Sequence, residues 1–245
     1  MSQALKNGLD ALLLVASRRS LGVTELAAEL GIDKSTASRI LATLQEADLV
    51  ERHPDTLRYA LGPTIVHLYE RYHRNLSVLA VARPVMERLA SEIRESVHLG
   101  VLANDQAVIV DQVLSDSRLV VNAQVGGSEP LHCSSVGKTL LAFAPDELRD
   151  SLLSALTLEA RTDRTITDVD RLSAELDRVR RQGYATDDEE LSVGIRCVAV
   201  PIRNSRGSYE YALGASGATG RMTPAKLDRV VALMLHAARD IHSQL

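Results

Sequence analysis

The sequence predicts an α+β protein of two domains: a winged helix-turn-helix, a linker helix, and a larger domain with an antiparallel sheet and flanking helices. Two apolar helical stripes separated by a glycine predict the first domain, and mixed strands and helices from residue 77 predict the second. At 245 residues the chain also exceeds one typical domain. We expect domains at residues 1–62 and 77–245, with the linker helix at residues 63–76.

The first domain should contain three helices around one small core. Residues 4–17 place apolar side chains on one helical face, which should close this core: Leu5, Leu9, Leu12, Leu13 and Ala16. A second stripe covers residues 23–30, Gly31 interrupts it, and a third covers residues 32–44. Thr24 and Asp33 are the expected N-caps of the last two helices, since each side-chain oxygen can accept a free backbone N–H.

A two-stranded wing should follow these helices. Residues 49–51 and 58–61 flank a polar turn at residues 53–56, where Pro54 favours a reversal. Two helices and a wing of this kind dock on double-stranded DNA, with the second helix in the major groove. The side chains expected to contact DNA are short hydroxyls and cations, namely Lys34, Ser35, Thr36, Ser38, Arg39 and Thr43 on the helix, and Arg52 and Arg58 on the wing.

The charge of this domain leaves another interpretation open. Residues 1–62 carry seven Lys and Arg against eight Asp and Glu, a net charge of −1. DNA binding by bulk electrostatics needs a basic domain, and some helix-turn-helix domains bind no DNA. If this domain binds DNA, its basic residues must be segregated onto the second helix and the wing.

The linker helix should begin after Gly62 and Pro63 and end near Asn75. Its apolar face includes Tyr69 and Tyr72. This face could either cap the small core or contact a second copy of the chain, and the sequence favours neither.

The elements of the second domain follow from periodicity, caps and turns. A long helix is predicted over residues 78–96, then a hairpin of strands 97–103 and 107–114, then a third strand over residues 119–125. Three helices should follow, at residues 134–143, at residues 145–156, and from a cap at Thr167 to Gly183. Strands 195–203 and 209–215 precede a last helix that opens at Thr223 and Pro224. Such a sheet with flanking helices is typical of domains that hold a small ligand.

One segment of this domain suits an anion. The run LHCSSVGKTLLA, residues 131–142, places Ser134 and Ser135 at a helix start, where free N–H groups and the helix dipole attract a carboxylate. Alternatively, Ser134 only caps the helix. The run lacks the first glycine of a phosphate-binding loop, because His132 stands there, so no nucleotide site is expected.

Two further segments contain candidate polar groups. In residues 183–201, GYATDDEELSVGIRCVAVP, four consecutive acids are typical of a solvated loop. If Asp187 instead faces the sheet, it could accept hydrogen bonds from a ligand hydroxyl or a backbone N–H. Cys197 is either an inert core residue or a nucleophile. The segment ALGASG, residues 212–217, either permits close approach of a ligand or forms a tight turn.

Composition excludes several classes of protein. Cys133 and Cys197 lack disulfide or metal-site spacing, so neither a metal nor a cofactor is expected. No apolar run approaches the roughly 18 residues of a membrane span, and no signal peptide is present. We therefore expect a cytoplasmic protein with no membrane partner.

The order and spacing of these features resemble one family. The winged N-terminus, the run PLHCSSVGK from Pro130, the run GYATDDEELSVGIRCVAVP and the segment ALGASG are similar, over nearly the whole chain, to the IclR family of bacterial transcriptional regulators. The resemblance implies a GAF-like effector-binding domain and assembly as homodimers or dimers of dimers. It also implies control of operons for carbon-source and aromatic-acid catabolism, with operator DNA and a small organic acid as partners.

The resemblance also implies a set of effector-binding residues: Ser135, Val136, Asp187, Ile195, Cys197 and Ser216. The backbone N–H groups of Ser135 and Val136 would hold the carboxylate. Members that bind two- or three-carbon keto acids often have a serine where Gly214 stands, so Gly214 should leave room for a larger, aromatic acid. Arg118 and Val121 are candidates to close the pocket, with Arg118 either a second carboxylate partner or an exposed strand residue.

A hydrolase is the alternative function of the second domain, with Cys197 or a serine as nucleophile. Such chemistry needs a base with an orienting partner, and His132 is the only histidine inside these segments. No catalytic triad can be assigned from the sequence. We therefore expect a ligand-sensing regulator and not an enzyme.

Overall fold

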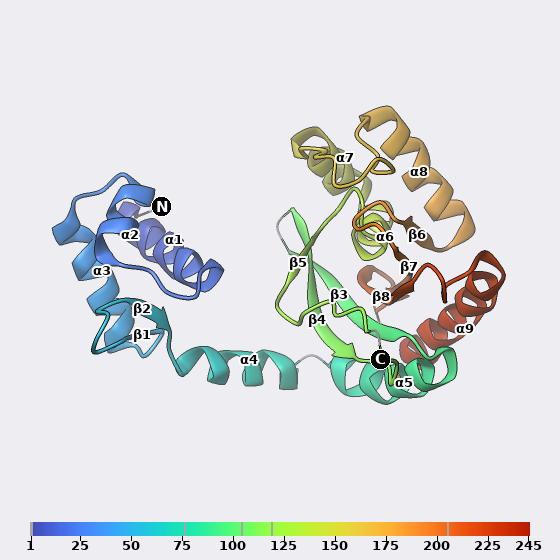
Figure 1. The fold of residues 1–245 in the computed structure, drawn as a ribbon, viewed down its shortest axis with the longest axis horizontal. Helices are drawn as coiled ribbons and strands as arrows, with labels where there is room; N and C mark the ends of the chain where they lie inside the picture. Colours follow the sequence, from blue (N-terminus) through green and yellow to red (C-terminus); the bar gives the residue numbers. More distant parts are fainter. Residues whose placement is uncertain (1, 76, 104, 119, 205) are drawn as a thin grey trace. The chain divides into compact units, whose positions relative to one another are not determined.

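The computed structural model describes residues 2–75, 77–103, 105–118, 120–204 and 206–245, and the chain forms two compact units, residues 1–76 and 77–245 (Figure 1). We call them the N-terminal and the C-terminal unit. No helix in the described part of the chain has the length and apolar character that crossing a membrane requires.

The N-terminal unit is a winged helix-turn-helix, as predicted. Its helices are α1 (Gln3–Ser17), α2 (Val23–Leu30), α3 (Lys34–Glu46) and α4 (Thr64–Asn75), and the wing is the antiparallel pair β1 (Val50–Arg52) and β2 (Tyr59–Leu61). The first three helices and the wing surround one core, whose buried side chains are Ala11, Val15, Leu21, Leu26, Ala27, Ala37, Leu41, Val50 and Tyr59. Helix α4 follows the wing directly (Figure 1).

The helix ends of this unit confirm one predicted cap and correct another. Asp33 caps α3, because its Oδ1 accepts the N–H of Thr36 at 2.9 Å. Thr24 does not cap α2, because the helix already begins at Val23 after Gly22. The N–H of Gly22 donates to the Glu25 carboxylate at 3.1 Å, so a side chain one turn into the helix satisfies its start.

Helix α1 turns a different face to the core than the sequence predicts. Ala11 and Val15 are fully buried, whereas Leu5, Leu9 and Leu13 are 57%, 51% and 66% exposed. The smaller residues let α1 approach the other helices closely, and this leaves the larger leucines as a stripe on the outside. We call Leu5, Leu9 and Leu13 the leucine stripe.

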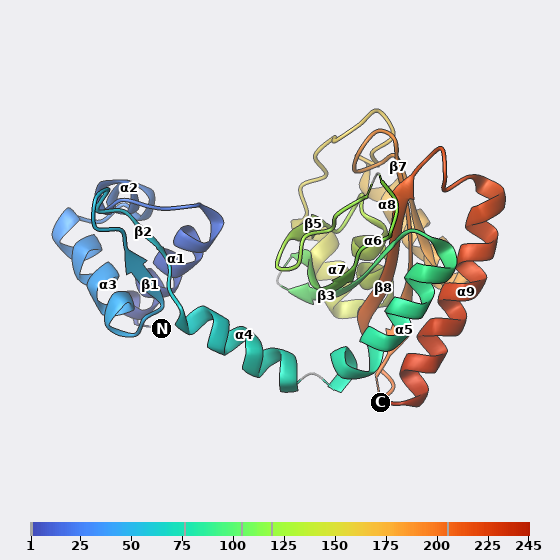
Figure 2. The ribbon, with the colours of Figure 1, turned by 60° about the horizontal axis from the view of Figure 1, so that its bottom comes forward.

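The C-terminal unit is an antiparallel sheet between two layers of helices. Strands β3 (Ser96–Ala103), β4 (Gln106–Val113), β5 (Ser128–Pro130), β6 (Ala185–Asp188), β7 (Ile195–Arg203) and β8 (Tyr209–Ala218) lie in the order β5-β4-β3-β8-β7-β6. Helices α5 (Ser77–Ile93) and α9 (Pro224–Ser243) pack side by side on one face (Figure 2). Helices α6 (Ser135–Phe143), α7 (Asp146–Ala155) and α8 (Val169–Gln182) lie on the other.

Three predicted elements of this unit differ from the structure. The described residues 120–125 form no strand, and the edge of the sheet is instead the short strand β5. The acidic run contributes strand β6, because Asp187 and Asp188 pair with β7. Helix α8 is capped by Asp168, which accepts the N–H of Arg171 at 2.8 Å, and not by Thr167.

Helix α6 is the innermost helix of the unit. Every residue from Ser135 to Ala142 is buried, because the helix lies between the sheet and α8. It also packs against β7 and β8, and the Thr139 hydroxyl donates to the carbonyl of Ala199 at 3.2 Å. These contacts fix the position of α6, and with it the position of its first residues, relative to the sheet.

We predict that Leu41→Ala lowers the free energy of unfolding of the N-terminal unit by about 3 kcal/mol, because it removes a fully buried side chain of α3 and leaves a cavity. Urea unfolding followed by circular dichroism measures this change. Gln45→Ala, at an exposed position of the same helix, is the control and should change stability by less than about 0.5 kcal/mol. Equal losses in the two variants would contradict the described packing of α3.

Candidate DNA-binding and effector sites

The outer face of α3 presents the side chains expected to contact DNA. Lys34, Ser38 and Arg39 are exposed, and Thr43 lies one turn beyond Arg39 and is exposed as well. Arg39 Nη2 donates to the Thr36 hydroxyl at 3.2 Å, which holds the guanidinium along the helix. This face therefore carries two cations and short polar groups that can approach a groove closely.

The predicted contacts of Ser35 and Thr36 are partly taken up within the helix start. The Ser35 and Thr36 hydroxyls donate to the Asp33 carboxylate at 2.5 and 2.8 Å. These bonds and the Thr36 N–H lower the pKa of Asp33 well below its usual range. The two hydroxyls thus orient the start of α3, and their hydrogens are not free for a base.

Arg58 has a different role from the one the sequence predicts. Its Nη1 and Nη2 donate to the two Glu25 oxygens at 3.0 and 2.7 Å, and its Nε donates to the Ser20 hydroxyl at 2.9 Å. The wing is thereby joined to α2, and the guanidinium lowers the pKa of Glu25. Arg52 remains exposed, over the Tyr59 ring at 5.7 Å from its centroid. Of the two wing cations, Arg52 is the one directed to solvent.

In the C-terminal unit, strand register brings three predicted effector residues into line. Asp187 pairs with Cys197, Cys197 with Ser216, and Ser216 with Ser96, so these four residues form a row across β6, β7, β8 and β3. We call it the first row. All four side chains are buried. Cross-strand partners share a face of the sheet, so the row presents one continuous polar line.

The first row faces α6. Ala185 and Ala199, which precede Asp187 and follow Cys197 by two residues, belong to the apolar cluster of α6 and α8. Residues two apart on a strand point to the same side. The first row therefore lies on the face that the start of α6 also covers.

The start of α6 keeps two free N–H groups next to this face. Ser134 caps the helix, since its hydroxyl accepts the N–H of Gly137 at 2.9 Å. The N–H groups of Ser135 and Val136 have no acceptor within the described part of the chain. Both residues are buried, and the helix dipole adds positive potential there. The geometry is suited to a carboxylate.

Asp187 faces inward and holds the turn that follows it. Its Oδ1 accepts the N–H groups of Glu190 and Leu191 at 2.7 and 3.2 Å. Burial raises the pKa of Asp187 to about 6, against the lowering effect of these bonds. The acidic run is thus not a solvated loop, since Asp187 fixes residues 187–191 beside the first row.

A buried ion pair lies behind the turn, and the sequence analysis missed it. Lys138 on α6 is fully buried, and its Nζ lies 2.5 Å from Glu190 Oε1 and 3.9 Å from Glu175 Oε1. Burial raises the pKa of Glu190 to about 7, while Lys138 acts in the opposite direction. A lysine among the apolar residues of α6 was the signal in the sequence, because such a charge needs a buried partner.

The two cysteines are poorly suited to nucleophilic attack. Burial raises the pKa of the Cys197 thiol well above its usual value, and Asp187 raises it further. Burial likewise raises the pKa of Cys133 to about 12. The His132 ring bonds to the carbonyl of Glu159, in the segment between α7 and α8, at 3.0 Å, and not to Cys197. These environments disfavour the hydrolase alternative, because the thiolate is the reactive form.

The remaining predicted residues are less closely tied to the first row. Ile195 begins β7 on the same face as Cys197 and is half-buried. Val121 is half-buried in the irregular segment before β5. Arg118 lies in the segment after β4, where it is exposed and not part of a strand. It therefore does not point into the domain as a carboxylate partner would, and of the alternative placement, an exposed strand residue, only the exposure is right.

A second row on the same face contains two polar residues that the sequence analysis missed. Ala199, Gly214, His98 and Gln112 are successive cross-strand partners on β7, β8, β3 and β4. The His98 ring lies over Gly214, where an added Cβ would be 2.3 Å from its Nε2. The sequence predicted that Gly214 leaves room for a larger ligand. This prediction is wrong, because the His98 ring fills that space.

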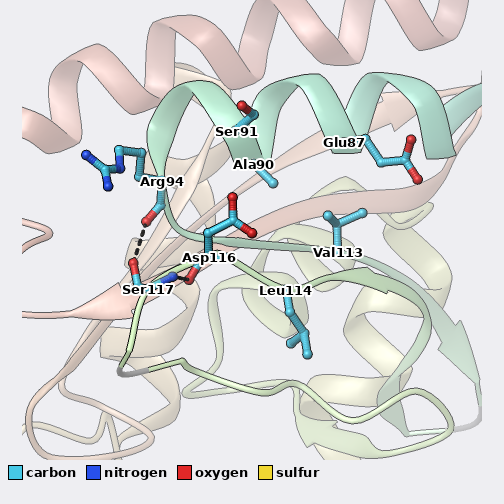
Figure 3. A pocket seen from close by; sticks show the side chains of 9 residues that line it. Glu87, Ala90, Ser91, Arg94, Val113, Leu114, Asp116 and Ser117 are labelled. Atoms are coloured by element: carbon cyan, nitrogen blue, oxygen red, sulfur yellow. Dashed lines mark hydrogen bonds between the residues drawn. The ribbon is translucent and has the colours of Figure 1, made fainter.

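A separate cleft lies on the opposite face of the sheet (Figure 3). It has a volume of about 270 Å³ and lies between α5 and the segment after β4, with Glu87, Arg94, Asp116 and Ser117 among its lining residues. The Ser117 hydroxyl donates to the carbonyl of Arg94 at 3.3 Å across it. None of the predicted effector residues lines this cleft.

A winged helix-turn-helix joined to a separate sheet domain is an architecture typical of DNA-binding transcriptional regulators, and comparisons identify the family. The family described as "Bacterial transcriptional regulator IclR C-terminal" matches residues 70–243, and the IclR helix-turn-helix domain matches residues 4–54. The chain therefore belongs to the IclR family.

Relatives and solved structures agree with this assignment. The transcriptional regulator BhcR of Paracoccus denitrificans is 34% identical, over 98% of this chain and 86% of the relative. The acetate operon repressor of Salmonella typhimurium is 32% identical, over 98% of this chain and 88% of the relative. An IclR homolog of Microbacterium hydrocarbonoxydans, solved in complex with 4-hydroxybenzoate, is 27% identical with a TM-score of 0.84 and covers 99% of both chains. The family model and these relatives are described as transcriptional regulators or repressors.

We predict that the folding stability of the C-terminal unit falls as pH rises from about 4.5 to about 7. A carboxyl group whose pKa is raised by folding binds its proton more tightly in the folded state, so Glu190 stabilises the fold at low pH and loses this contribution as it ionises. The slope for one group is at most about 1.4 kcal/mol per pH unit.

Urea unfolding at pH 5, 6, 7 and 8 measures this slope, and Glu190→Gln should flatten it. In that variant Asp187, whose pKa is raised to about 6, keeps a dependence of the same sign, and His98, whose pKa burial lowers to about 4, contributes one of the opposite sign. Glu159→Gln, at a more exposed carboxylate, is the control. An unchanged slope in Glu190→Gln would show that another group titrates.

Proposed function

We propose that this protein is a homodimeric regulator of a catabolic operon, which binds operator DNA through α3 and the wing and senses a small organic acid at the start of α6. The observation that carries the proposal is the pair of buried, unbonded N–H groups of Ser135 and Val136 facing the first row. A site of this kind satisfies a carboxylate without a cation. The protein acts where the bacterial chromosome lies, in the cytoplasm.

The proposed DNA-contacting residues are those that remain directed to solvent: Lys34, Ser38, Arg39, Thr43 and Arg52. Ser35 and Thr36 lie at the helix start, where their hydroxyl oxygens can still accept a hydrogen bond from an amino group of a base. Arg58 is a positioning residue for the wing, since Glu25 and Ser20 occupy its donors. Arg39, which projects from the middle of the exposed face, is the candidate for reading a base pair.

The proposed effector is a small organic acid. The relative from Microbacterium hydrocarbonoxydans was solved with 4-hydroxybenzoate, and this supports an aromatic acid as one member of the class to test. The carboxylate would accept hydrogen bonds from Ser135 and Val136, while Asp187, Cys197 and Ser216 would line the other side of the ligand, with Ile195 and Val121 at the margin. Arg118 is exposed, so we do not include it among the residues that bind the carboxylate.

Self-association is supported by apolar surface in the N-terminal unit. The leucine stripe of α1 is exposed at helical spacing, and α4 carries exposed Val66, Leu68 and Tyr69. Large apolar side chains that gather on an exposed helix face are typical of protein–protein contact surfaces. In a dimer, two DNA-binding domains held about 34 Å apart, or at a multiple of this, would bind two half-sites of an operator. Effector binding would then shift the population of arrangements in which both half-sites are engaged.

We predict that Arg39→Ala weakens operator binding by about 1–3 kcal/mol and relaxes specificity at one base pair. The measurement is fluorescence anisotropy with an operator selected from random-sequence DNA, and with variants of each base pair. Arg229→Ala, which removes the same charge from an exposed position of the C-terminal unit, is the control. Equal affinity and equal specificity for Arg39→Ala and the unsubstituted protein would contradict the assignment.

We also predict that Asp187→Ala leaves operator binding unchanged without effector but abolishes the response to it. A thermal-shift screen of small organic acids identifies the ligand, because a ligand stabilises the folded protein it binds. Calorimetry should then find affinity for that acid reduced by at least about tenfold, or 1.4 kcal/mol, in Asp187→Ala. Asp188→Ala, which removes the neighbouring half-buried carboxylate, is the control. Unchanged acid affinity in Asp187→Ala would overturn the proposed pocket.

A further inference from the structure

Two polar side chains of the second row have buried atoms without partners. His98 Nδ1 and Gln112 Nε2 are both inaccessible to solvent, and no residue in the described part of the chain bonds to either. The whole His98 side chain is only 1% exposed. Almost all buried polar atoms in folded proteins have a hydrogen-bond partner, so two orphaned atoms together point to a missing one.

The two atoms belong to neighbouring side chains on the face that α6 covers. His98 and Gln112 are cross-strand partners on β3 and β4. Their neighbours Leu99 and Asp111 point to the opposite face, where Arg83 of α5 binds Asp111 at 2.7 Å. Because side chains alternate along a strand, His98 and Gln112 lie on the face of the first row.

The chemistry of the two atoms indicates which kind of group would satisfy both. Burial lowers the pKa of His98 to about 4, so at neutral pH the ring is uncharged, with one nitrogen a donor and the other an acceptor. The amide nitrogen of Gln112 can only donate. A hydroxyl group satisfies both, because it accepts from Gln112 and either donates to His98 or accepts from it.

The pair lies within reach of the proposed carboxylate site. Val136, whose N–H is one of the two free groups of α6, contacts Gly100, where an added Cβ would lie 2.4 Å from Val136 Cγ1. Gly100 is two residues from His98 on β3, a distance of about 6.6 Å along a strand. A spacing of this order is comparable to the length of a small acid, whose carboxylate would lie at α6 and whose hydroxyl would lie at the second row.

We propose that His98 and Gln112 form a second polar subsite of the effector pocket, which takes a hydroxyl group, so that the effector is a hydroxy acid. The proposal rests on the function proposed above. An acid of the same shape without the hydroxyl would leave both buried atoms unsatisfied, and a site built for a hydroxyl rejects such an analogue. His98 and Gln112 are thus specificity-determining residues.

The test compares acids that differ only by a hydroxyl: 4-hydroxybenzoate with benzoate, and 3-hydroxybutyrate with butyrate. Calorimetry measures the affinity of the full-length protein for each. We expect at least one hydroxy acid to bind about tenfold more tightly than its partner, the factor of one well-formed hydrogen bond to buried groups. In Gln112→Met and in His98→Phe, which keep similar shapes, this advantage should fall to less than threefold.

Internal controls separate loss of the subsite from loss of the fold. The acid without a hydroxyl should bind each variant within about threefold of its affinity for the unsubstituted protein, because it does not use the subsite. Asp116→Asn, on the cleft of the opposite face, should leave all affinities unchanged. If His98→Phe fails to fold, Gln112→Met alone decides the outcome.

Two failures can be told apart. In the first case the acids bind and Asp187→Ala removes their binding, but hydroxy acids bind no more tightly than their partners without the hydroxyl. The proposed effector pocket is then supported and the proposed hydroxyl subsite is wrong. The same conclusion follows if the advantage persists in Gln112→Met. If no acid binds and none alters operator affinity, the proposed function is wrong, and the hydroxyl subsite, which rests on it, is rejected as well.

Discussion

The C-terminal unit depends on one constraint, the complete burial of helix α6 with a lysine inside it. Lys138 cannot lie in an apolar layer without a polar partner, and Glu190, 2.5 Å away, is that partner although burial raises its pKa to about 7. Glu190 belongs to the turn that Asp187 holds through two backbone N–H groups. The helix whose first N–H groups are proposed to bind the acid and the turn that Asp187 holds are therefore joined by one buried network.

This network explains how a polar site can exist inside a well-packed domain. The apolar side chains of α6 and α8 close the layer on one side, while Asp187, Cys197, Ser216 and Ser96 form a polar row on the sheet. The raised pKa values of Asp187 and Glu190 show that burial works against their charged forms. A bound acid would add a further negative charge, so the site needs the N–H groups and the dipole of α6 to accept it.

In the N-terminal unit the limiting feature is the absence of excess positive charge. Arg58 and Glu25 neutralise one another between the wing and α2, so Arg58 contributes stability to the fold and little field toward DNA. The cations left for DNA are few. In the proposed dimer two weakly binding DNA-binding domains would be held at a fixed spacing and would bind well through effective concentration, and the exposed leucine stripe is the surface that supports this proposal.

The sequence by itself determined the two domains, most of the elements, the cap at Asp33 and, through ordered motifs, the family. Caps, turns and helical or strand periodicity depend on residues that are close in sequence, so they can be recognised without knowing the tertiary structure. Only the tertiary structure decided which face of α1 is buried, since both Ala11–Val15 and the leucine stripe have helical spacing. It also decided that Arg58 pairs with Glu25, that Lys138 pairs with Glu190, and that His98 fills the space above Gly214. These partners are 33, 52 and 116 residues apart, so they meet only through strand register and helix packing, which no local pattern encodes.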